Sequence, residues 1–463
     1  MKLNYFNFKP FHGQILLTND FGKYLFLSPE EMKRAIAGQV EAETELGKKL
    51  IGTKMAYPET DLGFSYESRY DLREIKGFLN SATALHIFVV TTACNMRCVY
   101  CQANNGRDCP HMYMTMETAE RAVDIALQSP EICLSFEFQG GEPLLNFPVI
   151  RHIAEYAEAR KGRHKIEYNL VSNLTLLTDE ILDFLQQYQI GVSTSLDGPA
   201  FVHNRNRMFA DGKDTFDTVA RSIERVRSRN IKVGAIETTT KSSLSYPKDI
   251  VRTYAELGFD GVFIRPLTPL GKAAMHWDEI GYTAQEFVEF YKKAMEEIIQ
   301  INREGTFFKE AHACIFLDRI QGRNVNYMEL RSPCGAAVGQ MAYYADGNVF
   351  TCDEGRMVYE MGHDTFLLGN VYTNSYDDLV KSGVCRTVCS ASSLETIPSC
   401  CDCVYEPYCG TCPVVNYAMT GDLIEKSPRN YRCRIYSGML DCLFSKLQEN
   451  QEDTLRILMN WGN

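Results

Sequence analysis

The sequence has no long hydrophobic run, because even stretches such as Ile87-Phe88-Val89-Val90 are far too short to span a bilayer. The opening residues Met1–Phe6 have no long apolar stretch followed by a small-residue cleavage site, so we expect no secretory signal. Basic residues are also scarce, with 48 Lys and Arg against 59 Asp and Glu and a formal net charge of −11. A protein that grips a phosphate backbone normally carries the opposite sign. We therefore expect a cytoplasmic protein with neither a membrane segment nor a nucleic acid partner.

Neither disorder nor a disulfide framework fits the composition. Hydrophobic residues make up 45% and charged residues 23%, which are globular values, and 463 residues exceed one ordinary core. Thiols are kept reduced in the cytoplasm, so disulfides are not expected among the 17 cysteines. The cysteines form two groups, Cys94 with Cys98 and Cys101 and eleven between Cys334 and Cys442, and only Cys109, Cys133 and Cys314 lie elsewhere. This clustering predicts two metal-binding regions separated by a scaffold poor in cysteine.

Strand and helix patterns alternate between the two cysteine regions. Apolar or β-branched runs predict strands at 84–91, 132–138, 165–172, 189–196, 231–239 and 260–267. Helical apolar spacing predicts helices at 115–128, 146–160, 178–187, 214–229, 246–257 and 284–301. Six successive strand–helix units imply parallel strands with right-handed crossovers, in a doubly wound sheet or a partial barrel. In either form the ligand site lies at the carboxyl ends of the strands.

The regions on either side of this scaffold have a different pattern. Short strand-like pieces at 4–10, 14–18 and 23–27 precede a helix start at Ser28 and a polar helix to about Leu50. After about residue 302 the strand–helix rhythm stops and the cysteine-rich region begins. We therefore expect three parts: a small α+β module at 1–80, the scaffold at 81–310 and a cysteine-rich domain at 311–463.

The first cysteine group directly follows the first strand of the scaffold. Cys94-Asn-Met-Arg-Cys98-Val-Tyr-Cys101 places three thiols close together in one loop, and such thiolates hold iron–sulfur clusters. With three protein ligands, one iron of a cubane cluster stays open for an exogenous ligand. A structural zinc site would need a fourth ligand, which His111 could supply. Spacing favours the cluster over zinc and leaves both open.

Motifs at the ends of the strands separate these alternatives. Tyr100 precedes the last cysteine, Gly140-Gly141-Glu142-Pro143 follows the second strand, Asn173 closes the third, and Ser195-Leu196-Asp197-Gly198-Pro199, His203 and Arg207 follow the fourth. With the cysteine spacing, this set resembles the radical S-adenosylmethionine (SAM) superfamily over about 84–270. One departure is Asn204, where an aspartate is usual in that family. The resemblance implies a partial (β/α)6 TIM-like barrel of the radical SAM type.

The resemblance also implies the chemistry of the site. In such enzymes a 4Fe–4S cluster on the three cysteines binds SAM and cleaves it to a 5′-deoxyadenosyl radical, which abstracts a substrate hydrogen. Glycine lets the backbone approach a ligand closely, which assigns Gly140 and Gly141 to the methionine amine. Ser195 and Arg207 would bind the polar groups of SAM, with the guanidinium on the carboxylate. The predicted cofactor-binding set also includes Tyr100, Glu142, Pro143 and Asn173.

The second cysteine region has its own spacing, which is Cys334-x12-Gly347-x4-Cys352, then Cys400-x2-Cys403-x5-Cys409-x2-Cys412, then Cys433. This pattern resembles the SPASM extension of peptide-modifying radical SAM enzymes, which holds two auxiliary 4Fe–4S clusters. The resemblance assigns to the first auxiliary cluster Cys334, Cys352 and Cys412, and to the second Cys400, Cys403, Cys409 and Cys433. The alternative is a zinc ribbon, because the two Cys-x2-Cys pairs make a credible four-thiolate site.

Several further residues lie near these cysteines in the sequence. Gln340 occupies a place where some relatives supply a fourth ligand, so the first auxiliary cluster has an open iron or recruits another ligand. Asp353 follows Cys352, and an aspartate at the corresponding place in sulfatase-maturating enzymes is a candidate general base. The plain alternative for Asp353, the candidate catalytic residue, is a turn carboxylate. The spare thiols, which we expect to be structural or accidental, are Cys385, Cys389 and Cys401.

Enzymes with this extension mostly modify a residue within a ribosomally made peptide. The resemblance therefore implies a precursor peptide as substrate, a cross-link or related modification, and an electron donor such as flavodoxin or ferredoxin. Residues 1–80 are loosely similar to winged-helix peptide-recognition modules, which bind a leader segment as an added strand. Motifs at Asn4–Phe6, Leu17–Asp20, Phe263–Leu267 and Cys409–Pro413 resemble the maturase B type of the His-Xaa-Ser system, which works beside a second radical SAM maturase. Two alternatives remain: oxidation of Cys or Ser in a protein, as in sulfatase maturation, and a zinc-stabilised scaffold that binds a peptide.

Overall fold

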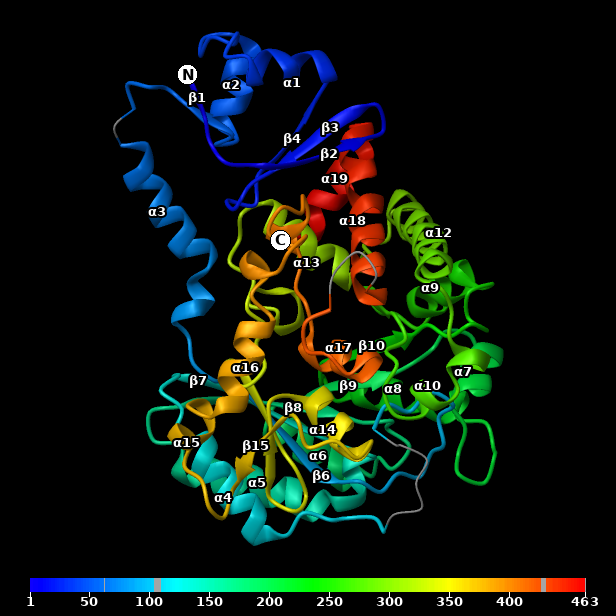
Figure 1. Cartoon of the computed structure of the whole chain (residues 1–463). Helices are drawn as coiled ribbons and strands as arrows, with labels where there is room; N and C mark the ends of the chain where they lie inside the picture. The colour runs from blue at the N-terminus through cyan, green and yellow to red at the C-terminus, as the bar shows by residue number, and fades with distance from the viewer. Residues whose placement is uncertain (62, 104–109, 426–429, 463) are drawn as a thin grey trace.

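A ten-stranded sheet organises the computed structural model, which describes residues 1–61, 63–103, 110–425 and 430–462 (Figure 1). Six parallel strands lie side by side in chain order: β6 (Leu85–Thr91), β7 (Cys133–Gly140), β8 (Lys165–Val171), β9 (Gly191–Ser195), β10 (Val233–Thr238) and β11 (Gly261–Arg265). A doubly wound sheet reverses its strand order at a switch point. The sequential order observed here is that of a partial barrel, and it resolves the choice that the strand–helix rhythm leaves open.

Helices that follow these strands cover the outside of the barrel. They are α4 (Met116–Ala126), η2 (Pro143–Asn146), α5 (Phe147–Arg160), α6 (Asp179–Gln187), α7 (Ala200–Asn206), α8 (Phe216–Ser228), α9 (Pro247–Glu256), α10 (Lys272–Met275), α11 (Trp277–Ile280) and α12 (Ala284–Arg303). Thr115 and Thr178 cap α4 and α6, since their hydroxyls accept hydrogen bonds from the backbone N–H groups of Thr118 and Ile181. The predicted strands and helices therefore agree closely with the observed ones.

The cysteine-rich region adds strands to both sides of this sheet. β12 (Lys309–Glu310) pairs with β11, and β13 (Gln340–Tyr343) pairs parallel with β6, followed by antiparallel β14 (Asn348–Phe350) and β15 (Leu367–Asn370). The other elements of this region are α13 (Ala311–Ile320), η3 (Met328–Leu330), α14 (Asp353–Glu360), α15 (Tyr376–Val380), α16 (Gly383–Ala391), η4 (Leu394–Thr396), η5 (Glu406–Tyr408), α17 (Pro413–Thr420), α18 (Tyr431–Glu449) and α19 (Glu452–Trp461). The register pairs Gln340 with Leu85, so a residue of the cysteine-rich region stands beside the first barrel strand.

The N-terminal module contains an antiparallel sheet in the order β2 (Asn7–Phe11), β3 (Gln14–Thr18) and β4 (Tyr24–Leu27). Its other elements are β1 (Lys2–Leu3) paired with β5 (Ala56–Tyr57), α1 (Pro29–Ile36), α2 (Glu45–Gly52), α3 (Phe64–Ile75) and η1 (Gly77–Asn80). The prediction of one helix from Ser28 to Leu50 is wrong. Gly38 adopts a left-handed φ of 70° that ends the first helix, and the Thr44 hydroxyl caps the second.

The N-terminal module packs against the end of the chain, as Figure 1 shows for the blue strands beside α18. The Thr18 hydroxyl donates a hydrogen bond of 2.6 Å to the Val404 carbonyl, and the Tyr408 hydroxyl donates one of 3.0 Å to the Gly22 carbonyl. These bonds fix the β3–β4 turn beside the loop that carries Cys403 and Cys409. Among the described residues, no helix combines the length and apolar character that crossing a membrane requires.

Candidate active site and cysteine groups

A cavity of about 240 Å³ opens at the carboxyl ends of the barrel strands. Residues predicted from the motifs line it: Cys94, Cys98, Tyr100, Cys101, Gly140, Gly141, Asn173, Ser195 and Arg207. Two members of the predicted cofactor-binding set, Glu142 and Pro143, do not line this cavity and are buried behind it. The loop of three cysteines and the ends of four strands thus meet in one place, as parallel strands require.

The two glycines of the second motif are required by the backbone next to them. A Cβ on Gly140 would lie 2.4 Å from the Thr91 carbonyl oxygen, and one on Gly141 would lie 2.3 Å from the Ala93 carbonyl oxygen. The Gly141 N–H donates to the Thr91 carbonyl at 2.8 Å. These contacts tie the end of β7 to the chain that leads into the cysteine loop. The glycines therefore position the thiols, in addition to presenting an open surface to the cavity.

Glu142 joins the ends of two neighbouring strands. Its carboxylate accepts hydrogen bonds from the Ser172 hydroxyl at 2.7 Å, the Asn173 N–H at 2.8 Å and the Leu144 N–H at 3.1 Å. The side chain is fully buried, and burial raises the pKa of Glu142 to about 7 against the opposing effect of these hydrogen bonds. Glu142 acts behind the cavity by orienting Asn173, which lines it.

Asp197 is the centre of a buried polar network that the sequence did not single out. Its carboxylate accepts hydrogen bonds from the Tyr100 hydroxyl at 2.7 Å, from Asn206 Nδ2 at 3.1 Å and from Arg207 Nε at 3.2 Å. The Arg207 guanidinium also lies over the Tyr100 ring, 5.0 Å from its centroid, and its Nη1 lies 3.7 Å from Cys98 Sγ. Asp197 therefore fixes a cation that faces the Cys98 thiol. The signal for Asp197 in the sequence was its place between Ser195 and Gly198 in the motif.

Asn204 has a structural role at the position where an aspartate is usual in the radical SAM superfamily. Its side-chain oxygen accepts hydrogen bonds from the backbone N–H groups of Thr215 at 3.1 Å and Phe216 at 2.9 Å. These groups lie at the start of α8, where an amide oxygen can serve as acceptor as a carboxylate can. The substitution therefore preserves the cap at the start of this helix.

The three thiols of the first group fit the cluster that their spacing predicts. All three line one cavity, which polar side chains such as Ser195 and Asn173 also line, and Arg207 faces Cys98. Burial raises the pKa of Cys94 to about 12 and that of Cys98 to about 11, although the Arg207 charge opposes the shift at Cys98. As thiolate ligands, these cysteines would need the positive charge of a cluster or a metal to offset this burial. The alternative zinc ligand His111 is exposed and does not line this cavity.

The predicted first auxiliary trio lies in an apolar cluster, and Met357 of this cluster also lines the cavity. Cys334, Cys352 and Cys412 are buried together with Leu270, Phe366, Val414 and other hydrophobic side chains. Burial and then the Cys412 thiol raise the pKa of Cys334 to about 12, which shows that the thiols are close enough to interact. Asp353, which follows Cys352, forms an ion pair of 2.5 Å with Arg356.

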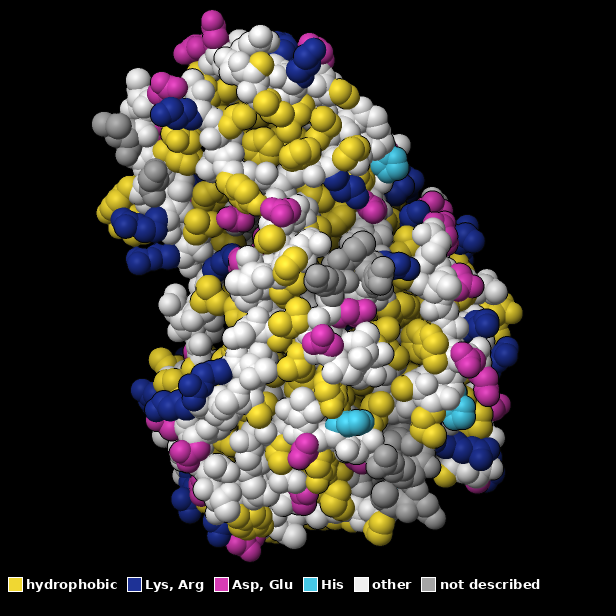
Figure 2. Space-filling view, in the orientation of Figure 1, with side chains coloured by type: hydrophobic (Ala, Val, Ile, Leu, Met, Phe, Trp, Pro, Cys, Tyr) yellow, Lys and Arg dark blue, Asp and Glu magenta, His cyan; other side chains and the backbone are white. Residues whose placement is uncertain are grey.

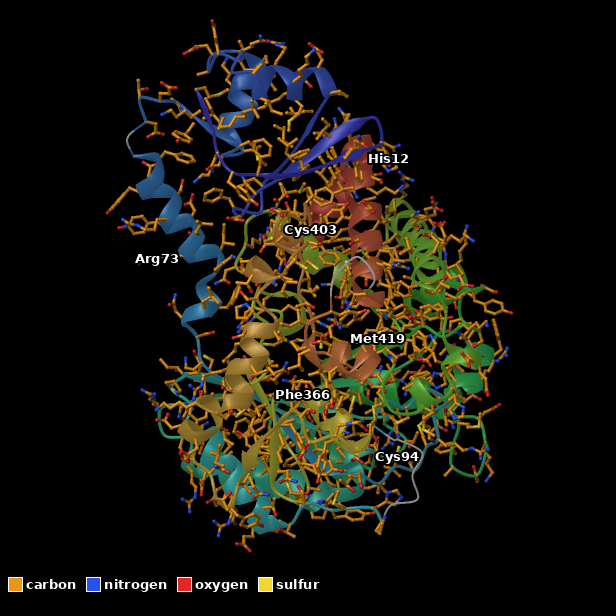
Figure 3. All side chains as sticks on the ribbon, viewed as in Figure 1. His12, Arg73, Cys94, Phe366, Cys403 and Met419 are labelled. Atoms are coloured by element: carbon orange, nitrogen blue, oxygen red, sulfur yellow. The ribbon has the colours of Figure 1, made fainter. Side chains whose placement is uncertain are left out.

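The predicted second auxiliary group brings together Cys400, Cys403, Cys409 and Cys433. Burial, then the Cys433 and Cys403 thiols, raise the pKa of Cys400 to about 12. The spare thiol Cys401 offers its backbone carbonyl to Asn7, and the spare pair Cys385 and Cys389 lies on α16. Figure 3 shows Cys94 and Cys403 at well-separated places, with Phe366 of the apolar cluster between them in this view.

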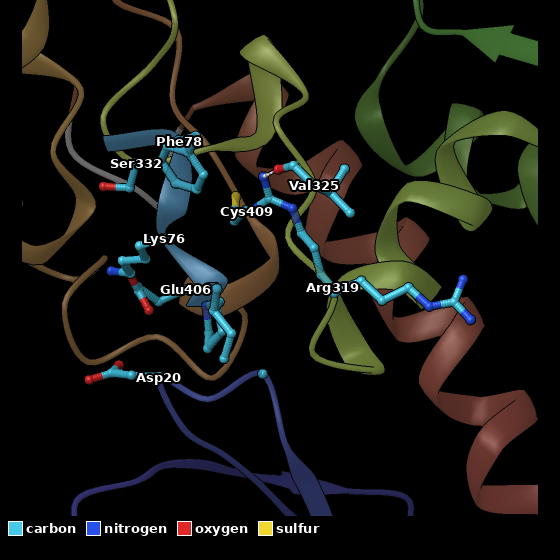
Figure 4. Close-up of a pocket in the computed structure, with 12 residues that line it drawn as sticks. Asp20, Lys76, Phe78, Arg319, Val325, Ser332, Glu406 and Cys409 are labelled. Atoms are coloured by element: carbon cyan, nitrogen blue, oxygen red, sulfur yellow. Dashed lines mark hydrogen bonds between the residues drawn. The ribbon is translucent and has the colours of Figure 1, made fainter. Parts of the chain in front are cut away.

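A small pocket of about 30 Å³ lies beside this second group (Figure 4). Arg319 and Cys409 both line it, and the Arg319 guanidinium donates to the Val325 carbonyl at 3.3 Å. The Arg319 Nε has no hydrogen-bond partner within the described part of the chain. Burial lowers the pKa of Arg319 to about 10, and the neighbouring Cys409 and Glu406 oppose that shift. A buried cation therefore stands next to one predicted cluster ligand.

The described residues contain no group of three or more His, Cys, Asp and Glu side chains arranged around a single metal ion. A cubane cluster spreads its protein ligands over separate iron atoms. The cysteines of one cluster therefore need to share a common environment and do not need to surround one point. The cavity is such an environment for the first group, and the apolar cluster is one for the first auxiliary trio.

A larger cavity of about 640 Å³ adjoins the first one inside the barrel. Both are lined by Gln102, Gln139, Val171, Ile236, Arg265 and Met357. Polar side chains of the larger cavity include Glu137, Glu167, Glu329, Gln340, Asp353 and Glu354. The two predicted outlying residues Gln340 and Asp353 thus face the barrel interior.

Comparison with known proteins gives the class of this fold. Residues 88–241 match the model of the radical SAM superfamily, whose members use SAM and a 4Fe–4S cluster. The match covers β6 to β10 and contains every motif that lines the smaller cavity up to Arg207.

More particular similarities extend over most of the chain. It is 25% identical over 377 residues to a cysteine-type anaerobic sulfatase-maturating enzyme of Clostridium perfringens, which covers 79% of this chain and 97% of that one. Solved structures of similar fold are native anSMEcpe with bound AdoMet and Kp18Cys peptide (TM-score 0.69, 22% identity, 82% of this chain and 99% of that one) and Streptococcus suis SuiB bound to precursor peptide SuiA (TM-score 0.54, 15% identity, 92% and 99%). Against the uncharacterized protein MJ0907 of Methanocaldococcus jannaschii, identity is 31% over 187 residues, and the alignment spans 40% of this chain and 63% of that protein.

These comparisons confirm the predicted radical SAM α/β fold and the interpretation of the chain as a radical SAM enzyme. They also relate its sequence to sulfatase-maturating enzymes and its fold to that of SuiB. The predicted similarity to His-Xaa-Ser maturases stays a prediction.

Proposed function

We propose that this enzyme binds a 4Fe–4S cluster through Cys94, Cys98 and Cys101, binds SAM beside it, and modifies a residue of a ribosomally made peptide. The single observation that carries the proposal is the shared cavity at the carboxyl ends of the strands, lined by the three thiols, Arg207 and the glycine motif. When bound, the cluster and SAM supply a 5′-deoxyadenosyl radical that removes a hydrogen atom from the substrate.

The residues of the chain then bind, orient and exclude water. Arg207 retains Nη groups that face the cavity while its Nε stays on Asp197, so it can bind a carboxylate without losing its buried partner. Ser195 and Asn173 add polar groups on the same wall. The Gly140 and Gly141 backbone leaves room for an amine. Together these groups recognise the amino acid part of SAM.

The larger cavity supports a peptide substrate, because it adjoins the SAM site and has room for a side chain with part of its backbone. Structures of similar fold hold a Kp18Cys peptide in anSMEcpe and precursor peptide SuiA in SuiB. In the N-terminal module, β2 and β4 are the edge strands, to which a leader segment would add as a further strand. Figure 2 shows hydrophobic side chains over this module, where Tyr5 and Phe8 are exposed.

The two cysteine groups of the C-terminal region would hold auxiliary clusters. Support comes from the burial of Cys334, Cys352 and Cys412 together and from the interaction among the second group of four thiols. Such clusters carry electrons between a donor, such as flavodoxin or ferredoxin, and the substrate site. Domain boundaries near 80 and 310 and a second maturase as partner also stay proposals.

A sulfatase-maturase-like oxidation is the second candidate. The favouring observation is that Asp353 lines the larger cavity, beside the substrate, as a general base would need to do. Its ion pair with Arg356 keeps the carboxylate in place. A product that has lost two hydrogens without a new cross-link supports oxidation, whereas a linkage resistant to peptide sequencing supports cross-linking.

The test of the proposed function is SAM cleavage by anaerobically reconstituted enzyme under reduction. The Cys94→Ala, Cys98→Ala, Cys101→Ala variant should form no 5′-deoxyadenosine above background. A matched triple variant at Cys133, Cys314 and Cys442, which belong to neither predicted cluster group, should keep the activity. Equal turnover in the first variant and the wild type would overturn the proposal. Iron content near three cubanes supports auxiliary clusters, and stoichiometric zinc with little iron supports the scaffold alternative.

A further inference from the structure

We propose that the larger cavity receives a basic side chain of the substrate peptide, a lysine or an arginine, held by Glu137, Glu167 and the amide of Gln340. This substrate class rests on the proposed function, and it deepens that function by naming what the peptide presents to the barrel. The inference comes from the balance of charge inside the cavity and from one amide without a partner.

Some charges that line this cavity are already neutralised by the protein. Glu329 forms ion pairs with Arg265 at 2.7 Å and with Arg432 at 2.9 Å. Asp353 is paired with Arg356 at 2.5 Å. These two carboxylates therefore have little charge left to offer a cationic group of the substrate, because breaking a buried ion pair is costly.

Other carboxylates of the same wall have no such compensation. Glu137, Glu167 and Glu354 line the cavity, and within the described ranges no Lys, Arg or His forms an ion pair with them. Glu137 accepts one hydrogen bond, of 2.5 Å, from the Gln139 amide. β7 and β8 pair Ser135 with Glu167, so Glu137 and Glu167 lie on adjacent strands of the barrel and point to the same interior. Arg265 offsets part of this charge at Glu137 and Glu354, but it is already paired with Glu329, so the carboxylates that line the cavity outnumber the cations that line it.

Gln340 provides an independent sign that a ligand belongs here. Its side chain is 7% exposed and lines the cavity, yet its amide makes no hydrogen bond to any described residue. Gln340 is not one of the described residues whose fully buried polar atoms lack a partner, so its amide opens onto the cavity, where water or a ligand satisfies it. Gln340 lies on β13 at the register of Leu85 on β6, next to the strand that carries Glu137. Its amide oxygen is a further acceptor on the wall that the two glutamates share.

A cation with several N–H donors would satisfy the hydrogen-bond acceptors on this wall. Carboxylate and amide oxygens accept hydrogen bonds, and an ammonium or guanidinium group brings three to five donors together with the compensating charge. An acidic side chain would be repelled, and an aliphatic one would leave Gln340 and the glutamates unsatisfied. The two cavities share Gln139, Val171 and Ile236, so a side chain anchored in the larger one has its carbon atoms next to the SAM site.

The test uses the holoenzyme with SAM and three tripeptide probes, Ac-Gly-Lys-Gly-NH2, Ac-Gly-Nle-Gly-NH2 and Ac-Gly-Glu-Gly-NH2, with binding measured by saturation-transfer NMR under anaerobic conditions. The lysine probe should bind roughly tenfold more tightly than the norleucine probe, the effect of about one charge-assisted hydrogen bond. The Glu137→Gln, Glu167→Gln double variant should lose that preference, and Gln340→Leu should reduce it. Glu224→Gln, an exposed change on α8, is the matched control.

Three outcomes overturn the inference: no binding of the lysine probe, equal binding of the lysine and norleucine probes, or an unchanged preference in the double variant. Cluster absorbance and circular dichroism of each variant show whether it has folded. The preference among probes is read without turnover, whereas the proposed function is read from 5′-deoxyadenosine. A charge preference without SAM cleavage would sink the proposed function alone, and SAM cleavage without a preference would sink the substrate class alone.

Discussion

Two trios of thiols lie in opposite surroundings. Cys94, Cys98 and Cys101 line a cavity that the charged side chain of Arg207 also lines, whereas the second trio, at Cys334, Cys352 and Cys412, lies within an apolar cluster. A group that must accept an exogenous ligand needs an open, polar side, and a group that only carries electrons or holds the fold does not. The difference between the trios therefore separates their proposed tasks better than the cysteine spacing does.

The two environments are also supported in different ways. The open trio (Cys94, Cys98 and Cys101) depends on two fully buried acidic side chains behind the cavity wall, which are Asp197 and Glu142. The closed trio (Cys334, Cys352 and Cys412) depends on hydrophobic packing. The second C-terminal cysteine group has a neighbouring cation, Arg319. Changes to buried charges should thus affect the open trio strongly and selectively.

The largest effect is expected at Asp197. Replacing it by Asn removes the charge that pairs with Arg207 and leaves a buried guanidinium without its partner, which costs about 3–5 kcal/mol. The Asp197→Asn variant should therefore unfold at a clearly lower denaturant concentration and lose SAM binding. Anaerobic denaturant titration and equilibrium SAM binding measure the two effects.

The control for this prediction is Asp211→Asn. Asp211 also pairs with a cation, Lys213, but both side chains are exposed, so little change in stability is expected. A similar loss in both variants, or SAM binding that survives in Asp197→Asn, would mean that the network behind the cavity does not position Arg207.

A smaller effect on the free energy of unfolding is expected at Glu142, and this effect depends on pH. Burial raises the pKa of Glu142 to about 7 in the folded state from its ordinary value of 4.5, so the folded protein keeps a proton that the unfolded chain loses between these values. The contribution of this group to stability is thus present at low pH and falls as pH rises from about 4.5 to about 7. The slope is about 1.4 kcal/mol per pH unit, so roughly 3 kcal/mol is lost in total.

Glu142→Gln removes this dependence because glutamine does not titrate. As pH rises from 5 to 7.5, the wild type should therefore lose unfolding free energy that the variant keeps. The stability of the variant relative to the wild type should rise over this range, whichever protein is more stable at pH 5. Denaturant titrations at the two pH values measure it. Parallel behaviour of the two proteins would show that Glu142 is already ionised in the fold.

The barrel and its motifs could be predicted from the sequence because their signals are local. Alternating strand and helix patterns gave β6 and the helices capped by Thr115 and Thr178 to within a few residues. The break between α1 and α2 was missed, since a single glycine in a polar segment, Gly38, is a weak signal until its φ of 70° is known.

The parts of the site that escaped prediction depend on distant segments. Asp197 acquires its role only when Tyr100 of the cysteine loop and Asn206 at the end of α7 approach it, from 97 and 9 residues away in sequence. Glu137 and Glu167 read as solvent-facing residues of alternating strands, and only closure of the barrel turns them toward a common interior. Sequence patterns assign residues to a strand face, but the curvature of the sheet decides what that face encloses.

The smallest effect is expected at the second C-terminal group. Arg319 places a buried positive charge beside Cys409, and a nearby cation favours the reduced, more negative state of an iron–sulfur cluster. In Arg319→Met the reduction potential of the cluster proposed there should fall by on the order of tens of millivolts. Arg323→Met is the matched control, because Arg323 lines the same pocket but is more exposed and paired with Asp318. A redox titration followed by electron paramagnetic resonance measures both, with the SAM-binding cluster as internal reference. An unchanged or raised potential in Arg319→Met would show that this charge does not act on the cluster. Both C-terminal cysteine groups would then differ from Cys94, Cys98 and Cys101 in the same way, because packing and not a nearby charge would set their surroundings.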